Sequence, residues 1–214
     1  MENEDREEYI MKNTLSDNIR IILASGSPRR TELLHTAGIT HEVIVSGADE
    51  DVRETVPSRL VEKLSEKKAR EVFNRLTEQG VSGDVVVIGA DTVVACDGTT
   101  LGKPEDEEDA ARMLRMLSAR EHHVYTGVTL CGTAGGEERQ ITFHEESTVH
   151  VAKLSQEEIR SYIDTGEPMD KAGAYGIQGS FMKFVSGIEG DYFNIVGLPV
   201  SHLYQALKQF IGWE

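Results

Sequence analysis

Two arginines lie at the start of a predicted helix, where they could bind phosphate. Arg29 and Arg30 follow Ser27, which suits an N-cap, and Pro28, which suits the first helical position. Most helices carry acidic residues in this turn, because the macrodipole already makes it positive. Two arginines beside unpaired backbone N–H groups therefore favour an anion site. The stretch alone leaves a second interpretation equally open, in which both arginines are solvated and pair with nearby acids.

Two lysines could add to this positive charge. Lys68 falls near the middle of the apolar face of a helix predicted over residues 57–79, one turn from other inward residues. A lysine on a packed face is costly unless its ammonium meets an anion or extends to the edge of the helix. Lys103 precedes Pro104, which stiffens the backbone beside it, although a lone lysine of this kind is more often a surface charge.

Carboxylates are predicted near the ends of two strands. Asp91, in the segment Gly-Ala-Asp-Thr, is expected at or just beyond the end of the most hydrophobic strand, residues 85–88. Open α/β sheets commonly place their chemistry at strand ends. Glu50, between Asp49 and Asp51, follows an earlier strand. A turn-capping aspartate and a solvated acid cluster are the alternatives, but carboxylates at two strand ends could hold a divalent metal.

A glycine-rich segment near the C-terminus could approach a ligand closely. Gly173, Gly176 and Gly179 recur every third residue, and Gln178 lies between the last two. Glycine lets the backbone come near a ligand, and a glutamine amide offers both a donor and an acceptor to the edge of a base. A tight structural turn is the alternative. Together with the cations and carboxylates, the segment indicates a nucleoside triphosphate site in which a metal or a base could activate water.

The predicted elements alternate between strands and helices, as in an α/β protein. The predicted strands cover residues 19–24, 41–46, 85–88, 93–96, 124–131, 145–153 and 193–196. The predicted helices cover residues 28–37, 57–79, 106–117, 155–164 and 199–211. The run over residues 85–88 is apolar throughout, which is typical of a central strand buried on both faces.

Composition limits the class of protein. With 39% hydrophobic and 28% charged residues, the 214-residue chain predicts one globular domain over residues 19–214, behind a flexible acidic extension over residues 1–18. No apolar run approaches the roughly 18 residues of a membrane span. The N-terminus is acidic where a signal or transit peptide would be basic, so we expect a cytoplasmic protein. The net charge of −15 disfavours a nucleic acid polymer, but a few focused cations could still bind a small anion.

The sequence closely resembles the Maf family of nucleoside triphosphate pyrophosphatases. The matching segments are LASGSPRRTELL, GADTVV, LGKPEDEEDAARML, VYTGV, GEPMDKAGAYGIQG and IEGDYFNIVGLP, in the order and spacing of the family. The resemblance implies the α/β fold shared with inosine triphosphatases, in which helices flank a mixed twisted sheet with a central cleft. It also implies hydrolysis between the α- and β-phosphates, which yields a nucleoside monophosphate and pyrophosphate.

The resemblance also implies roles for individual residues. Asp91 matches the proton acceptor that activates water, and Glu50 with Asp91 would hold Mg²⁺ or Mn²⁺, with Asp49 as a further candidate ligand. The positions that match phosphate binding are Ser27, Arg30, Lys68 and Lys103. The positions that match base preference are Arg29, Thr92 and Gln178.

Threonine after Gly-Ala-Asp and the later Gly-Ile-Gln-Gly resemble the family branch that acts on dTTP and UTP. We therefore expect a nucleotide-pool enzyme for dTTP and UTP, with CTP and modified pyrimidine nucleotides as further candidate substrates. The resemblance suggests a homodimer that binds a nucleoside triphosphate as its substrate. Because Maf-like proteins are also linked to arrest of cell division, a nucleotide-binding regulator with little catalysis is the alternative.

Overall fold

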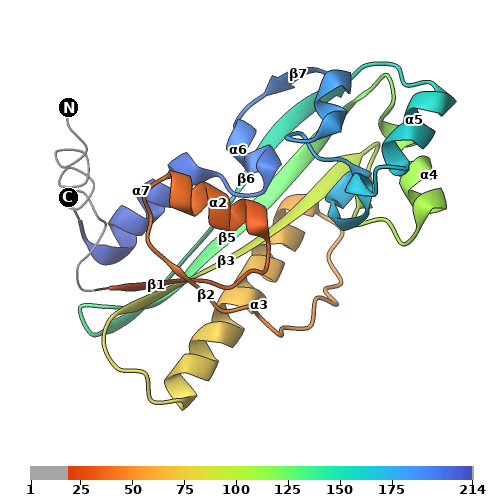
Figure 1. Cartoon of the computed structure of the whole chain (residues 1–214). Coiled ribbons are helices and arrows are strands. Elements are labelled where there is room, and N and C mark those ends of the chain that lie inside the picture. The colour runs from red at the N-terminus through yellow and green to blue at the C-terminus, as the bar shows by residue number, and fades with distance from the viewer. Residues whose placement is uncertain (1–18, 214) are drawn as a thin grey trace, which may run out of the picture.

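A mixed sheet runs through the centre of the molecule (Figure 1). The computed structural model describes residues 19–213, so the predicted acidic extension over residues 1–18 lies outside the described residues. The strands are β1 (Arg20–Leu23), β2 (Glu42–Val43), β3 (Val85–Cys96), β4 (Thr99–Leu101), β5 (Glu121–Ala134), β6 (Glu137–Val151) and β7 (Val185–Glu189). They lie in the order β2-β1-β3-β5-β6-β7, with β4 paired to β3. β1 is parallel to β2 and β3, and the other pairs are antiparallel, which confirms the predicted mixed sheet.

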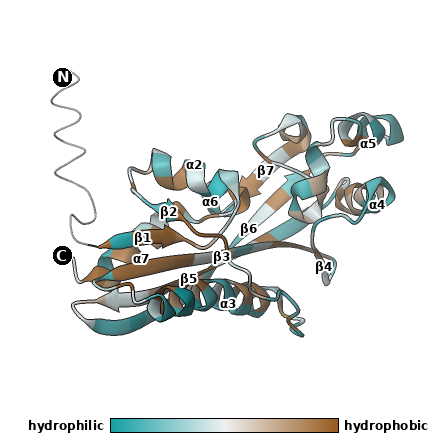
Figure 2. Cartoon of the chain, turned by 60° about the horizontal axis from the view of Figure 1, so that its bottom comes forward, coloured by the Kyte–Doolittle hydropathy of each residue, from teal (hydrophilic) through white to brown (hydrophobic). Residues whose placement is uncertain are grey.

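Helices cover both faces of this sheet (Figure 2). The α-helices are α2 (Pro28–Thr36), α3 (Pro57–Glu78), α4 (Glu107–Leu117), α5 (Gln156–Ile163), α6 (Tyr192–Val196) and α7 (Val200–Ile211). Three short 3₁₀ helices follow α5, namely η1 (Glu167–Asp170), η2 (Ala172–Ala174) and η3 (Ser180–Phe184). α3 packs on one face, whereas α2 and α7 pack on the other. The predicted α/β class with flanking helices is thus confirmed.

Alternation along β1 and β3 explains how one sheet supports two cores. Ile22 and Val87 face α3, whereas Leu23 and Ile88 face the side of α2 and α7. Successive side chains of a strand point to opposite faces, so a strand covered on both faces is apolar at every position. All four of these side chains are fully buried.

β3 corrects one prediction about the site. The Gly-Ala-Asp-Thr segment does not end the strand, because β3 continues through it to Cys96 and pairs with β5 from Val85 to Ala95. A Cβ added at Gly89 would lie only 2.1 Å from the carbonyl oxygen of Ser65 in α3. The glycine therefore allows α3 to lie close to the sheet and does not mark a turn. Asp91 consequently lies inside a strand, opposite Gly127 of β5.

Two further predictions near the C-terminus were wrong or incomplete. The apolar run predicted as a strand over residues 193–196 belongs to the short helix α6, whose N-cap Asp191 accepts a hydrogen bond from the N–H of Phe193 at 2.8 Å. Its Asn194 is fully buried and donates to the carbonyl oxygen of Val124. The edge strand β7, residues Val185–Glu189, was not predicted, because its alternation is weak and it contains a glycine.

Other elements agree with the predictions within a few residues. The long helix over residues 57–79 is α3, and the capping box of Ser155 and Glu158 opens α5. The hairpin of β5 and β6 is longer than predicted and turns at residues 135–136, whose N–H groups donate to Asp84. The predicted strand over residues 41–46 is reduced to β2.

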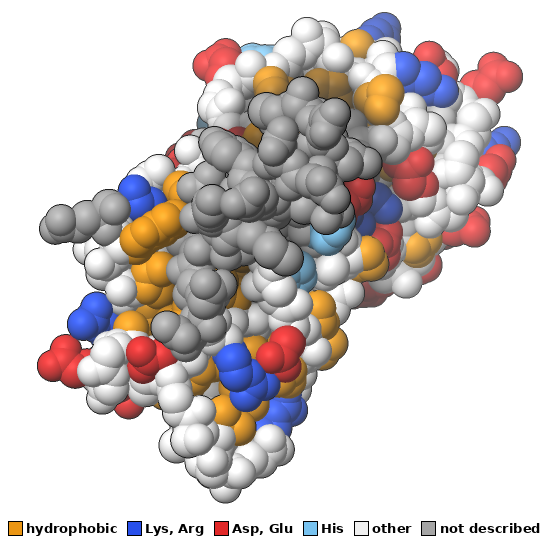
Figure 3. All heavy atoms as spheres, turned by 60° about the vertical axis from the view of Figure 1, so that its left-hand side comes forward, with side chains coloured by type: hydrophobic (Ala, Val, Ile, Leu, Met, Phe, Trp, Pro, Cys, Tyr) orange, Lys and Arg blue, Asp and Glu red, His pale blue; other side chains and the backbone are white. Residues whose placement is uncertain are grey.

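The surface mixes charges of both signs. On the face shown in Figure 3, lysine and arginine side chains are scattered among aspartate and glutamate side chains. Across residues 19–213, no helix combines the length and the apolar character that crossing a bilayer requires.

Candidate active site

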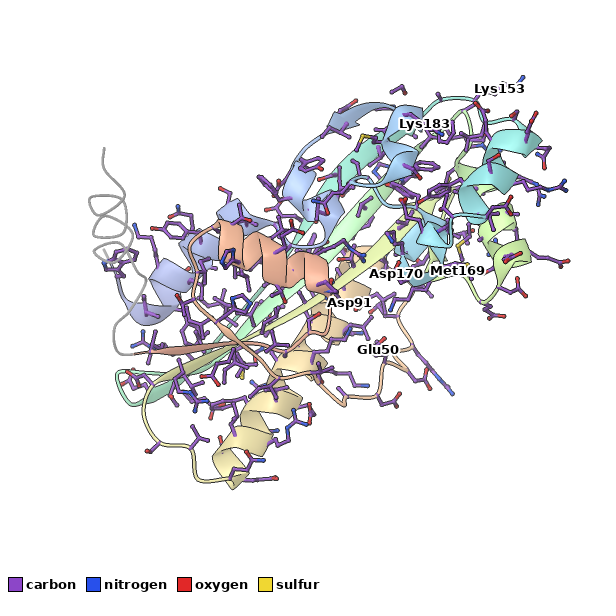
Figure 4. The ribbon with its side chains drawn as sticks, in the orientation of Figure 1. Glu50, Asp91, Lys153, Met169, Asp170 and Lys183 are labelled. Carbon is purple, nitrogen blue, oxygen red and sulfur yellow. The ribbon has the colours of Figure 1, made fainter. Side chains whose placement is uncertain are left out.

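One cavity of about 790 Å³ contains every side chain for which the sequence predicted a catalytic, phosphate, base or metal role, apart from Asp49. The predicted residues that line it are Ser27, Arg29, Arg30, Glu50, Lys68, Asp91, Thr92, Lys103 and Gln178. Figure 4 shows Glu50, Asp91 and Asp170 near the middle of the molecule, where this cavity lies, whereas Lys153 and Lys183 lie towards the top of the view. Asp49 instead lies in a separate surface depression beside α3. The predicted central cleft is therefore present.

The cavity opens where β3 extends beyond its shorter parallel neighbour. β1 ends at Leu23, which pairs with Ile88, whereas β3 continues for eight residues beyond that pair, to Cys96. Asp91 and Thr92 point to opposite faces of the strand, yet both reach the cavity because no β1 residue lies beside them. The site thus lies at the carboxyl end of β1. It is at a strand end, as expected for an α/β sheet, but the strand that ends there is β1 and not β3.

Lys68 joins the two carboxylates predicted to hold a metal. Its Nζ lies 2.6 Å from Asp91 Oδ1 and 2.9 Å from Glu50 Oε1. The Lys68 and Asp91 side chains are only 13% and 15% exposed, whereas Glu50 is 65% exposed. The hydrogen bond from Lys68 lowers the pKa of Glu50 below its ordinary value. The inward direction predicted for Lys68 from the helical period is therefore confirmed.

Arg30 is buried and connects three parts of the fold. Its Nε donates to the carbonyl oxygen of Gly197 at 2.8 Å, Nη1 to Ser25 Oγ at 2.9 Å and Nη2 to Thr92 Oγ1 at 3.0 Å. Burial lowers the pKa of Arg30, although the charge of Asp91 opposes that shift. A guanidinium has five N–H donors, so two of them have no partner assigned within residues 19–213 and could serve a ligand.

The remaining predicted residues are more exposed. Arg29 forms an ion pair with Asp170 of η1 at 3.2 Å. Lys103 follows β4, and Gln178 lies between η2 and η3. Ser27 occupies the N-cap position of α2 without a side-chain cap hydrogen bond. Its hydroxyl lies in the same cavity-lining segment as the N–H groups that open α2.

Sequence reasoning missed two polar residues of this cavity. Ser25 was not predicted to belong to the site, but its hydroxyl accepts hydrogen bonds from Arg30 and from the N–H of Ser27. Asp170 was not singled out, although it pairs with Arg29 and also lines the cavity. Its adjacent opposite charge, Lys171, within a glycine-rich segment was the available signal.

Comparisons with known proteins identify the family of the chain. The family model described as Maf-like protein matches residues 20–210. A dTTP/UTP pyrophosphatase of Agathobacter rectalis is 49% identical over 198 residues, which cover 89% of this chain and 97% of the relative. The dTTP/UTP pyrophosphatase of Geobacillus sp. is 48% identical, over 91% of this chain and 99% of the relative. That of Lachnoclostridium phytofermentans is 47% identical, over 89% and 95%. The match to the family model and the coverage of these relatives show that the chain belongs to the Maf family.

Proposed function

We propose that the chain is a nucleoside triphosphate pyrophosphatase that cleaves dTTP and UTP between the α- and β-phosphates. The observation that carries this proposal is the convergence of cations and two carboxylates in one cavity, from elements far apart in the sequence. Relatives that are 47–49% identical over about nine-tenths of the chain are named dTTP/UTP pyrophosphatases, which supports the same substrates. CTP and modified pyrimidine nucleotides belong in the same assay.

Residues from α2, from α3 and from the segment after β4 would bind the phosphates. Ser27 and Arg30 at the start of α2, Lys68 of α3 and Lys103 after β4 line the cavity together. Three cations match the several negative charges of a triphosphate, and a bidentate guanidinium suits phosphate oxygens. Buried cations act in a low dielectric, where they stabilise charge more strongly than they would in water.

The donor set of the cavity fits a divalent cation. Glu50 and Asp91 contact one ammonium, so their oxygens already converge on a single positive group. Within residues 19–213, no cluster of three or more histidine, cysteine or acidic side chains could hold a metal. Two carboxylates alone suit Mg²⁺ or Mn²⁺, because such ions are commonly held by one or two carboxylates together with substrate phosphates. When bound, the ion would neutralise phosphate charge and polarise the phosphoryl group.

Asp91 is the proposed general base. Its carboxylate lies on a rigid central strand and is 15% exposed, so it can accept a proton from one water molecule in the cavity. Lys68 would exchange its contact with Asp91 for the triphosphate, which frees a carboxylate oxygen and brings the ammonium to a phosphate. Arg30 and Lys103 would stabilise the charge that develops on the pyrophosphate leaving group.

Base selection is assigned to the outer part of the cavity. Arg29 and Gln178 are on its exposed side, and the hydroxyl of Thr92 already bonds to Arg30 and to Thr126. Donors and acceptors fixed around a base can discriminate strongly, because a wrong base leaves them unpaired.

The alternative function, a nucleotide-binding regulator of cell division with little catalysis, is not favoured, because the relatives named above are pyrophosphatases. A cytoplasmic location and a homodimer stay predictions.

The test is pyrophosphate release from a panel of canonical and modified triphosphates, compared by kcat/KM. We expect steady release from dTTP and UTP with Mg²⁺ or Mn²⁺, and none after addition of EDTA. Tight nucleotide binding without metal-dependent turnover would contradict the proposal and support the regulator. Comparison among pyrimidine nucleotides would also identify the preferred base and sugar.

A further inference from the structure

The loop that carries Gln178 is held on both sides by one carboxylate. Glu167, at the start of η1, accepts hydrogen bonds from the backbone N–H and from the hydroxyl of Ser180, each at 3.0 Å. Its other oxygen accepts a hydrogen bond from the hydroxyl of Tyr162 at 2.9 Å. That hydroxyl oxygen in turn accepts the N–H of Gly176 at 3.1 Å. Glu167 therefore connects the residues before and after Gln178, directly or through Tyr162.

One glycine makes room for this carboxylate. A Cβ added at Gly179 would lie 1.8 Å from Glu167 Oε1, whereas one added at Gly176 would first meet the Lys171 side chain, 2.7 Å from its Cε. Gly179 has a φ of −97°, so it is required for close approach and not for a left-handed backbone. The loop backbone thus lies directly against the carboxylate, which restricts where Gln178 can be.

Further contacts keep Glu167 ionised and fixed. Burial by itself raises the pKa of Glu167, but hydrogen bonds from Ser180 and Tyr162 and the charge of Lys171 bring that pKa below its ordinary value. Lys171 Nζ also donates to the backbone carbonyl oxygen of Glu167 at 2.7 Å and to the Asp170 carboxylate at 2.6 Å. Hydrogen bonds to an ionised acceptor are stronger than those between neutral groups.

We propose that Glu167 is a positioning residue for base selection, because it fixes the loop of residues 176–180 so that Gln178 presents its amide to the base. The inference rests on the proposed function, in which Gln178 contacts the base. Glu167 is not among the residues that line the cavity, so it acts through the loop and not by touching the nucleotide.

Amide hydrogen exchange on the nucleotide-free protein tests the loop directly. Glu167→Gln keeps the size of the side chain but replaces one acceptor oxygen with a donor. We expect exchange in a peptide covering residues 176–180 to accelerate about tenfold, whereas β3 exchanges as in the wild type. Unchanged exchange in that peptide would overturn the proposal. This outcome does not depend on whether the chain hydrolyses any nucleotide.

Kinetics test the consequence for the base. For Glu167→Gln we expect the preference for UTP over ATP, measured as the ratio of kcat/KM values, to fall about tenfold, mainly through KM. Inorganic tripolyphosphate has no base, so its inhibition constant should stay within about twofold of the wild-type value. An unchanged base preference, or an equal loss of tripolyphosphate binding, would contradict the proposed role. A wild-type protein without activity on dTTP or UTP would instead refute the proposed function. The hydrogen exchange measurement would then still test whether Glu167 fixes the loop.

Two variants complete the experiment. Glu158→Gln is the matched control, since Glu158 accepts a hydrogen bond from the N–H of Ser155 in the capping box of α5 and has no hydrogen bond to the loop of residues 176–180 in the described part of the chain. It should keep wild-type exchange and base preference. Tyr162→Phe removes the bridge to Gly176 without changing charge, so it carries the same test if Glu167→Gln fails to fold. A Tyr162→Phe protein with wild-type exchange and base preference would count against the proposal.

Discussion

Arg29 and Arg30 are adjacent in the chain but belong to two differently built regions. Arg30 is 9% exposed and bonds to Ser25, Thr92 and Gly197, each from a different part of the fold. We call Ser25, Arg30 and Gly197 the inner wall; Thr92, proposed for base selection, borders it through its hydrogen bond to Arg30. Arg29, Asp170 and Gln178 form the rim, where the Arg29 side chain is 32% exposed and its Asp170 partner is 63% exposed. One step along a helix turns a side chain by about 100°, which separates the two arginines.

The difference matches the two parts of a nucleotide. The triphosphate is the same in every nucleoside triphosphate, so a rigid inner wall can serve all of them. The base varies, and selection among bases depends on the contacts at the rim. Rigid contacts reduce the cost of organising a transition state, whereas exposed contacts contribute little to stability. Substitutions in the inner wall should therefore affect stability and turnover, and substitutions in the rim should affect selectivity.

The largest effect is expected at Asp91, on the strand between these regions. Asp91→Asn keeps the shape of the side chain but removes the proposed general base, so we expect kcat to fall about 10³-fold. Circular dichroism and the unfolding midpoint should match the wild type, because the hydrogen bond to Lys68 can be kept. Turnover near the wild-type value would show that another group activates water.

Arg30→Ala tests the rigid inner wall. The change leaves the buried acceptors of Ser25 and Gly197 and the partly buried hydroxyl of Thr92 without their donor, and buried polar groups without partners are costly. We expect a loss of about 3 kcal/mol in the free energy of unfolding, measured by urea denaturation, together with severe loss of activity. Arg30→Lys supplies the control for charge alone. If Arg30→Ala were as stable as the wild type, the hydrogen bonds of Arg30 would not hold the inner wall together.

Low pH should destabilise the buried contact between His122 and Tyr175, which lies next to the rim. His122 of β5 is fully buried, and its Nε2 lies 2.7 Å from the hydroxyl of Tyr175, a cavity residue close to Gln178. Burial lowers the pKa of His122 from 6.5 to about 4. Its Nδ1 has no hydrogen-bond partner in the part of the chain that the structure describes, so an added proton would be unsatisfied.

The free energy of unfolding should fall as the pH falls, because His122 binds a proton more readily in the unfolded chain than in the folded chain. Neutral His122 contributes about 3 kcal/mol to the free energy of unfolding. This contribution is complete above about pH 6.5 and is lost as the pH falls towards 4. The measurement is the free energy of unfolding between pH 8 and 4, compared with His122→Gln, which does not titrate. Equal slopes in the two proteins would contradict the expected titration.

Arg29→Ala should have the smallest effect on stability. An exposed ion pair contributes at most about 1 kcal/mol, so we expect the unfolding midpoint to change little. The preference for UTP over other triphosphates should fall about tenfold while kcat stays near the wild-type value. A large loss of stability, or a uniform loss of activity on all nucleotides, would remove the distinction between rim and inner wall.

Several features of the fold and the site could be predicted because they depend on local pattern. The helical period placed Lys68 on the inner face of α3, and its contact with Asp91 agrees. The strand end expected at Asp91 was wrong, because Gly89 resembles a chain break in sequence but serves the close approach of α3. The run over residues 193–196 was taken as a strand, since short apolar runs suit either element and only the Asp191 cap and the burial of Asn194 decide for α6.

The sequence alone determined which chemical groups the site contains, since arginines, lysines, carboxylates and a glycine-rich loop are readable from residue types and their order. Only the tertiary structure decided which of these groups are buried in the inner wall and which lie at the rim. The extension of β3 beyond β1 opens both of its faces to one cavity, and the packing of α2 buries Arg30 while it leaves Arg29 partly exposed. These outcomes depend on contacts between segments distant in sequence, such as Arg30 with Gly197 or Lys68 with Asp91, and local propensity carries no information about them.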